Sequence, residues 1–237
     1  AALQQMKALL DRTLDLARFD AGVQQVDMQP LNLASTLASI HRAVMPAYRA
    51  AGVTLHWAVE GGLEDVEGGV HVLGDVLRIR QAIMNVLHNG SKYSARGDSV
   101  YFSASVAWSD SKRMSPRLAA PNPGPTPGGQ AGSSKTPPAA AGEERPEDWA
   151  AFGSTTSSGG GGANSRCHLL VRVRDTGRGM TDAEQASIFT PFARLHTAQE
   201  GTGLGLNIAK KAMVAHGGDV QVWSAGIGEG CTFTITA

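Results

Sequence analysis

The chain has 237 residues, of which 42% are hydrophobic, enough for a substantial buried core in one or two domains. Basic and acidic residues number 21 each, so net charge indicates neither nucleic acid nor an anionic membrane surface, and we expect no nucleic-acid partner. The two cysteines fit no metal-ligand spacing or disulfide framework, and we find neither a secretory signal nor an apolar run of roughly 18 residues that would span a membrane.

The chain opens with an apolar stripe of helical spacing over residues 2–19, followed by a stop at 20–22. Such a stripe predicts packing on another helix. Because the first residue already falls inside this helix, we expect the chain to be part of a longer protein.

A break is predicted at Gln29 and Pro30, because proline lacks a backbone N–H. Asn32 is then placed to cap a second helix over residues 33–51, which Gly52 ends. Alternating residues predict a strand over 53–59, and a shorter strand is expected over 69–73.

The most informative stretch is residues 75–94, DVLRIRQAIMNVLHNGSKYS. At 100° per residue, apolar side chains fall on one face of a helix and amides with an amine on the other. The apolar face is Val76, Ile79, Ile83, Val86 and Leu87, and the polar face is Asn85, Asn89 and Lys92 with Tyr93 beside them. An ordinary amphipathic helix is the alternative, but asparagine and Gly90 are poor helix formers, Gly90 costing about 1 kcal/mol relative to alanine.

A strand is predicted over residues 99–107, and the composition then changes abruptly. Residues 109–165 contain most of the 11 prolines and few aliphatic side chains. Such a segment buries too little apolar surface to offset its ordering entropy, so we predict a disordered insertion. Order resumes with a strand over 168–174 that pairs with 99–107 as a hairpin whose loop has been expanded.

The remaining elements are a short helix over 182–188, a helix that opens at GTGLGL and ends near residue 216, and a terminal hairpin of strands 219–223 and 231–236. Strands and helices are mixed without strict alternation. The predicted fold class is therefore α/β, a two-layer α/β sandwich in which helices lie on one face of a mixed sheet.

Two glycine-rich turns carry the chemistry. GTGLGL lacks the third glycine of a dinucleotide fingerprint, and the sequence has no P-loop motif. Gly203 and Gly205 instead fall at a helix start, where free N–H groups and the helix dipole bind phosphate oxygens, although a simple flexible turn would look similar. Asp175, followed by Gly177 and Gly179, suits the exocyclic amine of adenine, a weak signal on its own because Asp and Gly are common in turns.

The motifs NVLHNGSKYS, DTGRGM, IFTPF and GTGLGLNIAKK occur in this order, and the chain closes with GEGCTFTI. Together they closely resemble the catalytic ATP-binding domain of sensor histidine kinases, whose superfamily also includes gyrase, heat-shock chaperone ATPases and MutL. The resemblance covers residues 29–237 except the insertion. LLDRTLDLARFDAG resembles the second helix of the dimerisation and phosphoacceptor hairpin, which implies a partial dimerisation helix over 1–22 and a kinase domain over 23–237, interrupted at 109–165.

The resemblance implies that Asn89 coordinates Mg²⁺, that Lys92 and Tyr93 contact the nucleotide, and that Asp175 reads adenine. Phe189 and Phe192 would anchor a lid, unless they are plain core residues, and the short lid offers Arg194 and His196 as cations. The implied ATP-binding residues are Asn85, Asn89, Lys92, Tyr93, Asp175, Gly177, Gly179, Gly201, Thr202, Gly203, Leu204 and Gly205.

Position 85 separates the branches of this superfamily. Hydrolytic relatives carry a glutamate there as general base toward water, whereas Asn85 cannot accept a proton at neutral pH. The nucleophile is therefore expected to come from elsewhere, and the resemblance implies a histidine on the first helix of the hairpin, outside this chain. His41 lacks the acidic neighbour of the family's acceptor, and His88 is expected at the surface or pocket rim. Gly90 stands where the family prefers alanine, which predicts a looser helix.

The sequence therefore predicts the ATP- and Mg²⁺-dependent core of a protein histidine kinase. The resemblance implies a homodimer, phosphoryl transfer to the aspartate of a response-regulator receiver domain, and an intracellular location, with any membrane anchor outside this chain. The alternatives are a hydrolytic ATPase or protein serine kinase of the same superfamily, and a degenerate nucleotide-binding or dimerisation module.

Overall fold

The computed structural model describes residues 26–59, 71–110, 165–193 and 202–237, together with residues 6, 10, 13, 14, 17 and 21. The chain forms two compact units, one of Ala1–Trp108 with Cys167–Ala237 and one of Ser109–Arg166. The elements described below belong to the first unit, apart from the adjoining ends of two strands. Most of the expected insertion, residues 111–164, and most of the expected N-terminal helix lie outside the described residues, so the proposed domain division stays a prediction.

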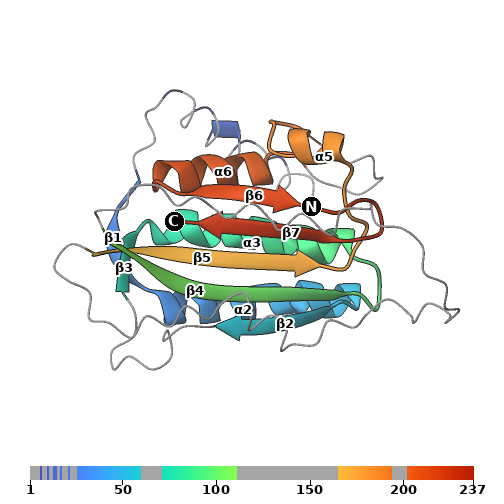
Figure 1. Ribbon diagram of the computed structural model, residues 1–237, viewed down its shortest axis with the longest axis horizontal. Helices are drawn as coiled ribbons and strands as arrows, with labels where there is room; N and C mark the ends of the chain where they lie inside the picture. Colours follow the sequence, from blue (N-terminus) through green and yellow to red (C-terminus); the bar gives the residue numbers. More distant parts are fainter. Residues whose placement is uncertain are drawn as a thin grey trace, which may run out of the picture. The chain divides into compact units, whose positions relative to one another are not determined.

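Five strands form the main sheet in the order β2-β4-β5-β7-β6 (Figure 1). Their bounds are Thr54–Val59 for β2, Ser99–Asp110 for β4, Ser165–Asp175 for β5, Asp219–Trp223 for β6 and Cys231–Thr236 for β7. β2 pairs with β4 in parallel, and β7 pairs antiparallel with both β5 and β6. The sheet is therefore mixed, and the predicted terminal hairpin is confirmed.

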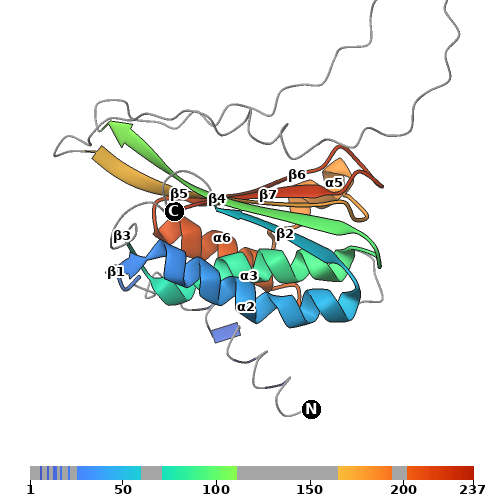
Figure 2. The ribbon, with the colours of Figure 1, turned by 90° about the horizontal axis from the view of Figure 1, so that it is seen from below.

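Three helices cover one face of this sheet: α2 (Leu33–Ala51), α3 (Val76–Tyr93) and α6 (Gly205–Ala215) (Figure 2). A short helix, α5 (Asp182–Ser187), follows β5. The predicted two-layer α/β sandwich is thus confirmed. Fully buried side chains from both layers fill the space between them, among them Leu37, Ile40, Ile83, Val86, Leu87, Phe102, Val171 and Ile235.

The helix ends follow from local sequence signals. The Asn32 side chain caps α2 by accepting a 2.9 Å hydrogen bond from the Ser35 N–H, and Gly52 ends the helix in the left-handed conformation. Asp75 caps α3 by accepting from two backbone N–H groups of its first turn. The predicted bounds of both helices are therefore confirmed to within a residue.

Two details of the prediction were wrong. Gln29 and Pro30 do not break the chain: they begin β1 (Gln29–Asn32), which pairs antiparallel with β3 (His71–Gly74) in a separate two-stranded sheet. Proline is tolerated because each strand of such a pair is an edge strand and needs fewer N–H donors. Val76 does not join the apolar face of α3: at 42% exposure it lies in the first turn, at the end of the helix.

Of the helices that the structure describes, none combines the length and hydropathy needed to cross a bilayer.

Candidate functional site

The polar face of α3 forms one wall of the candidate site. Asn85, Asn89, Lys92 and Tyr93 are each half-buried, while the opposite face of the helix is packed into the core. The Lys92 amine contacts the next residue, with Nζ 3.2 Å from the Tyr93 hydroxyl and 4.8 Å from the centre of its ring. The predicted division of this helix into a packed face and a polar face is present.

The start of α6 lies beside this polar face. The Asn85 amide Nδ2 donates a 2.9 Å hydrogen bond to the carbonyl oxygen of Gly205, the first residue of α6. A Cβ on Gly205 would sit 3.4 Å from the Asn85 amide, so the two helices approach closely here. The N-terminus of α6 is therefore held against α3 at position 85.

The first turn of α6 carries no capping side chain. Leu204 at the N-cap makes no side-chain hydrogen bond, whereas α2, α3 and α5 are each capped by a polar side chain. Leu204 itself is fully buried, and its N–H lies 3.4 Å from the Thr202 hydroxyl. N–H groups in the first turn of an uncapped helix are available to an anion.

Gly203 fits a position that other residues would not. Its φ is +69°, and a Cβ would lie only 2.7 Å from the Ala193 carbonyl oxygen. A side chain there would be both strained and blocked by backbone atoms. Gly201, Arg194 and His196 lie outside the described residues.

Asp175 ends β5 and is almost fully buried, with 5% exposure. Its Oδ1 accepts hydrogen bonds from the backbone N–H of Gly177, at 3.0 Å, and of Cys231, at 3.2 Å. Burial raises the pKa of the Asp175 carboxyl above its ordinary value, and these two hydrogen bonds oppose that shift without cancelling it. The carboxyl group is thus fixed through one oxygen at the end of the central strand.

The turn after Asp175 contacts the C-terminal end of α3. A Cβ on Gly177 would lie 2.6 Å from the Tyr93 carbonyl oxygen, so only glycine permits this approach. The Arg178 N–H lies 3.4 Å from the same carbonyl oxygen. Gly179 packs against the backbone of Gly226. The structure therefore brings the Asp175 turn against the C-terminal end of α3, at the backbone of Tyr93.

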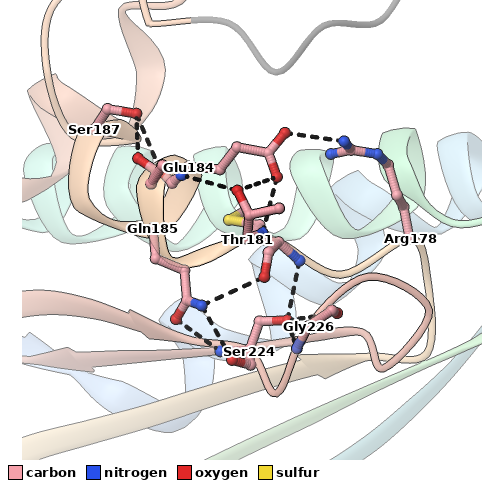
Figure 3. Close-up of polar contacts among 9 residues, drawn as sticks. Arg178, Thr181, Glu184, Gln185, Ser187, Ser224 and Gly226 are labelled. Carbon is pink, nitrogen blue, oxygen red and sulfur yellow. Dashed lines mark hydrogen bonds and ion pairs between the residues drawn. The ribbon is translucent and has the colours of Figure 1, made fainter.

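A polar network that the sequence analysis did not single out holds this turn in place (Figure 3). Arg178 forms a 2.9 Å ion pair with Glu184, which also accepts a 2.9 Å hydrogen bond from the Thr181 N–H. The pKa of Glu184 is lowered, mainly by the hydrogen bond from the Thr181 N–H. The contact with Arg178 makes the second-largest lowering contribution. The spacing of Thr181 and Glu184 is a capping box at the start of α5, a readable sequence signal.

The loop between β6 and β7 is attached to α5 by a second pair of contacts (Figure 3). Gln185 donates through Nε2 to the Ser224 carbonyl oxygen at 3.0 Å and accepts through Oε1 from the Ser224 N–H at 2.9 Å. The buried Ser224 hydroxyl accepts a 3.0 Å hydrogen bond from the Met180 N–H. No local signal in the sequence would have predicted this long-range pairing.

The two phenylalanines expected to anchor a lid differ in their surroundings. Phe189 packs against the core, its carbonyl oxygen accepts a 2.6 Å hydrogen bond from Asn207, and Lys210 lies 4.7 Å from its ring centre. Phe192 is 59% exposed.

The two histidines weighed in the sequence analysis lie on different helices. The His41 ring on α2 packs against Trp57 with centroids 4.7 Å apart. His88 is exposed on α3.

Comparison with known structures identifies the fold. Full-length ShkA, solved in complex with AMPPNP, superposes with a TM-score of 0.62 at 21% identity, covering 98% of this chain and 35% of that chain. The Acinetobacter baumannii histidine kinase AdeS gives a TM-score of 0.60 at 15% identity, covering 99% and 78%. The mycobacterial sensor histidine kinase MprB gives 0.51 at 19% identity, covering 88% and 95%. The fold is that of the sensor histidine kinases.

Sequence comparison gives a family match over the C-terminal third of the chain. Residues 154–237 match the histidine kinase-, DNA gyrase B-, and HSP90-like ATPase family. The circadian input-output histidine kinase CikA of Synechococcus elongatus is 41% identical over 70 residues, covering 28% of this chain and 9% of CikA. Over residues 154–237 the chain therefore resembles the ATP-binding catalytic domain of histidine kinases. It spans less than a tenth of the length of CikA and about a third of ShkA.

Proposed function

We propose that the chain binds Mg–ATP against α3 and the start of α6 and transfers the γ-phosphoryl group to a histidine outside this chain. The observation that carries the proposal is the contact of Asn85 with Gly205. This hydrogen bond joins the start of α6, which we propose binds phosphate, to the polar face of α3, and it gives position 85 a hydrogen-bonding role instead of a proton-accepting one. Such an arrangement supports transfer to protein more than transfer to water.

Adenine recognition is assigned to Asp175. Because Oδ1 already accepts two backbone N–H groups, the second carboxylate oxygen is the acceptor proposed for the exocyclic amine. Gly177 lacks a side chain, which lets this turn sit directly against the Tyr93 carbonyl oxygen and shapes the proposed adenine cleft. Gly179 completes the same turn.

Phosphate binding is assigned to the start of α6 and to the neighbouring polar face of α3. The uncapped N–H groups at the start of α6 hold phosphate oxygens, with Gly201, Thr202, Gly203, Leu204 and Gly205 forming the approach to the helix. Lys92 brings a positive charge, and Tyr93 borders the same pocket. The donors and the charge together stabilise the negative charge on the transferring phosphoryl group.

Asn89 is the residue proposed to contact the metal ion. Among the described residues there is no group of three or more His, Cys, Asp or Glu side chains that would form a protein-built metal site. A single amide oxygen suits Mg²⁺, which keeps waters and takes phosphate oxygens as its other ligands. When bound, Mg²⁺ supplies further neutralisation of the phosphates.

The wider reaction follows from this assignment. We infer a homodimer formed through the N-terminal hairpin, with passage of the phosphoryl group to the aspartate of a receiver domain. Because ATP is the substrate, we place the domain on the cytoplasmic side of any membrane anchor that lies outside this chain. His41, which packs on Trp57, is not proposed as the acceptor.

The test combines the 237-residue chain, the helix that precedes it in its full-length protein, and radiolabelled Mg–ATP. Acid-labile phosphohistidine should form on the added helix, persist in a His41→Gln variant and disappear in Asn89→Ala. Labelling that survives in Asn89→Ala would refute the site. Steady release of phosphate by the chain alone would favour the hydrolytic alternative, and a lack of Mg-dependent ATP binding in calorimetry would favour a degenerate module.

A further inference from the structure

A buried tyrosine from α2 contacts the backbone of α3 at the level of the candidate site. Tyr48 is 1% exposed, and its hydroxyl donates a 2.8 Å hydrogen bond to the Leu87 carbonyl oxygen. Burial, and secondarily the charge of Asp175, raise the pKa of Tyr48, so the hydroxyl stays protonated and keeps its role as donor. Two residues distant in sequence are thus joined where α3 passes over α2.

Gly90 lies at the same contact, where a side chain would be tightly crowded. A Cβ there would be 3.0 Å from the Tyr48 hydroxyl oxygen and 3.4 Å from both methyl groups of Val100 on β4. Gly90 is not in the left-handed region, so crowding by its neighbours, and not backbone conformation, favours glycine here. The glycine therefore has a packing reason, whereas its helix propensity alone predicts a looser helix.

This contact lies on the core side of the residues proposed to meet the nucleotide. Asn89 directly precedes Gly90, and Lys92 follows within the same turn of α3. The interior of a protein is close-packed and transmits small displacements. Any atom that pushes Gly90 away from Tyr48 and Val100 also shifts the neighbouring polar side chains.

We propose that Tyr48 and Gly90 form a size-matched pair that sets how deeply α3 sits on the sheet, which makes Tyr48 a positioning residue for Asn89 and Lys92. The proposal rests on the assignment of these two residues to the ATP site. Its distinctive consequence is compensation: a methyl group added at position 90 is tolerated once the Tyr48 hydroxyl is removed.

The experiment is a double-mutant cycle in the full chain, using Gly90→Ala, Tyr48→Phe and the double variant. Calorimetry with Mg–AMPPNP should show affinity weakened roughly 10-fold in Gly90→Ala, since small misplacements of binding groups are costly. Tyr48→Phe, which keeps the ring, should change affinity less than about threefold, and the double variant should return to within about threefold of wild type. Ser91→Ala is the matched control: it introduces alanine one residue away, where the serine hydroxyl bonds only within its own helix turn.

A double variant that binds as weakly as Gly90→Ala overturns the inference, because the two positions would then act independently. Should Gly90→Ala be unfolded, a folded double variant supports the pairing and an unfolded one overturns it. Backbone hydrogen exchange over residues 89–93 gives a readout without nucleotide: exchange should rise in Gly90→Ala and recover in the double variant. If wild type binds no AMPPNP, the proposed function fails, and the exchange comparison alone decides the packing relation.

Discussion

Asn85 of α3 donates its side-chain N–H to the Gly205 carbonyl oxygen at 2.9 Å, so one amide connects two helices 120 residues apart in sequence. An amide is suited to this position because it presents a donor to a carbonyl oxygen. A carboxylate at the same place would present only acceptors. Asn85, on which the proposed transfer to protein depends, is therefore also a structural link between α3 and α6.

We expect Asn85→Asp to lower the free energy of unfolding by about 1–3 kcal/mol without nucleotide, because a carboxylate would face the Gly205 carbonyl oxygen. Urea denaturation followed by circular dichroism measures the change. Asn89→Asp makes the same substitution one helical turn later and should have a smaller effect. Equal destabilisation of the two variants would contradict a special role for the Asn85 contact.

We expect Asp175→Asn to increase the stability of the fold and to weaken nucleotide binding. Because burial raises the pKa of Asp175, the folded state retains this proton at pH values where the unfolded state has lost it. The resulting contribution favours folding at low pH and is lost as pH rises from 3.8 through the folded pKa. The asparagine variant, which keeps an acceptor for Gly177 and Cys231, should therefore gain stability relative to wild type across this window.

The same variant should bind AMPPNP about 10- to 100-fold more weakly, as expected for loss of a hydrogen bond to a charged group. Unfolding measured between pH 4 and pH 7, and calorimetry at neutral pH, test the two halves of the prediction. An asparagine variant that is markedly less stable than wild type at neutral pH would show that the carboxylate supports the fold.

For Glu184 the pH dependence has the opposite sign. The hydrogen bond from the Thr181 N–H, followed by the contact with Arg178, lowers the pKa of Glu184, so this carboxylate stabilises the fold above 4.5, and the contribution is lost as pH falls through the folded pKa. Glu184→Gln should be less stable than wild type at pH 7, and the difference should shrink in acid. Asp182→Asn, in the same helix turn but without the Arg178 contact, is the control; an equal pH response in both variants would argue against the network.

Gln185→Glu should loosen the loop between β6 and β7. The glutamate cannot donate to the Ser224 carbonyl oxygen and would place a charge beside it, which we expect to cost about 1–3 kcal/mol of unfolding free energy. Hydrogen exchange at the Ser224 amide should accelerate while amides in the middle of α2 remain protected. Unchanged exchange at Ser224 would mean that the loop is held by its other contacts.

Much of the fold was predictable because its signals are local. Periodicity located α2 and α3, and the polar residues Asn32 and Asp75 marked their first turns. Alternation and glycine turns located the terminal hairpin. The candidate site was predicted from side chains spaced along one helix and from two glycine-rich turns. The structure adds that a glycine of one turn, Gly177, sits against the backbone of Tyr93.

What could not be predicted depends on pairs of residues far apart in the chain. The register of β1 with β3, in which Pro30 faces Leu73, has no counterpart in local pattern. Neither does the space that Tyr48 occupies beside Gly90, which the sequence alone presents as an unfavourable helix residue. Packing supplies the reason for both.

The order of strands also bears on how this protein could change its length. The Thr176 N–H donates to the Ser99 carbonyl oxygen. The start of β4 and the end of β5, where Asp175 lies, are therefore at the same end of the two strands. Within the same compact unit, these two strands extend to Trp108 and Cys167, and Cys167 lies about 26 Å from Asp175 along β5, at roughly 3.3 Å per residue. Sequence gained or lost between Trp108 and Cys167 therefore joins this unit at strand ends remote from the residues proposed to face the nucleotide, which leaves the junction open to evolutionary variation and to the grafting of a reporter domain.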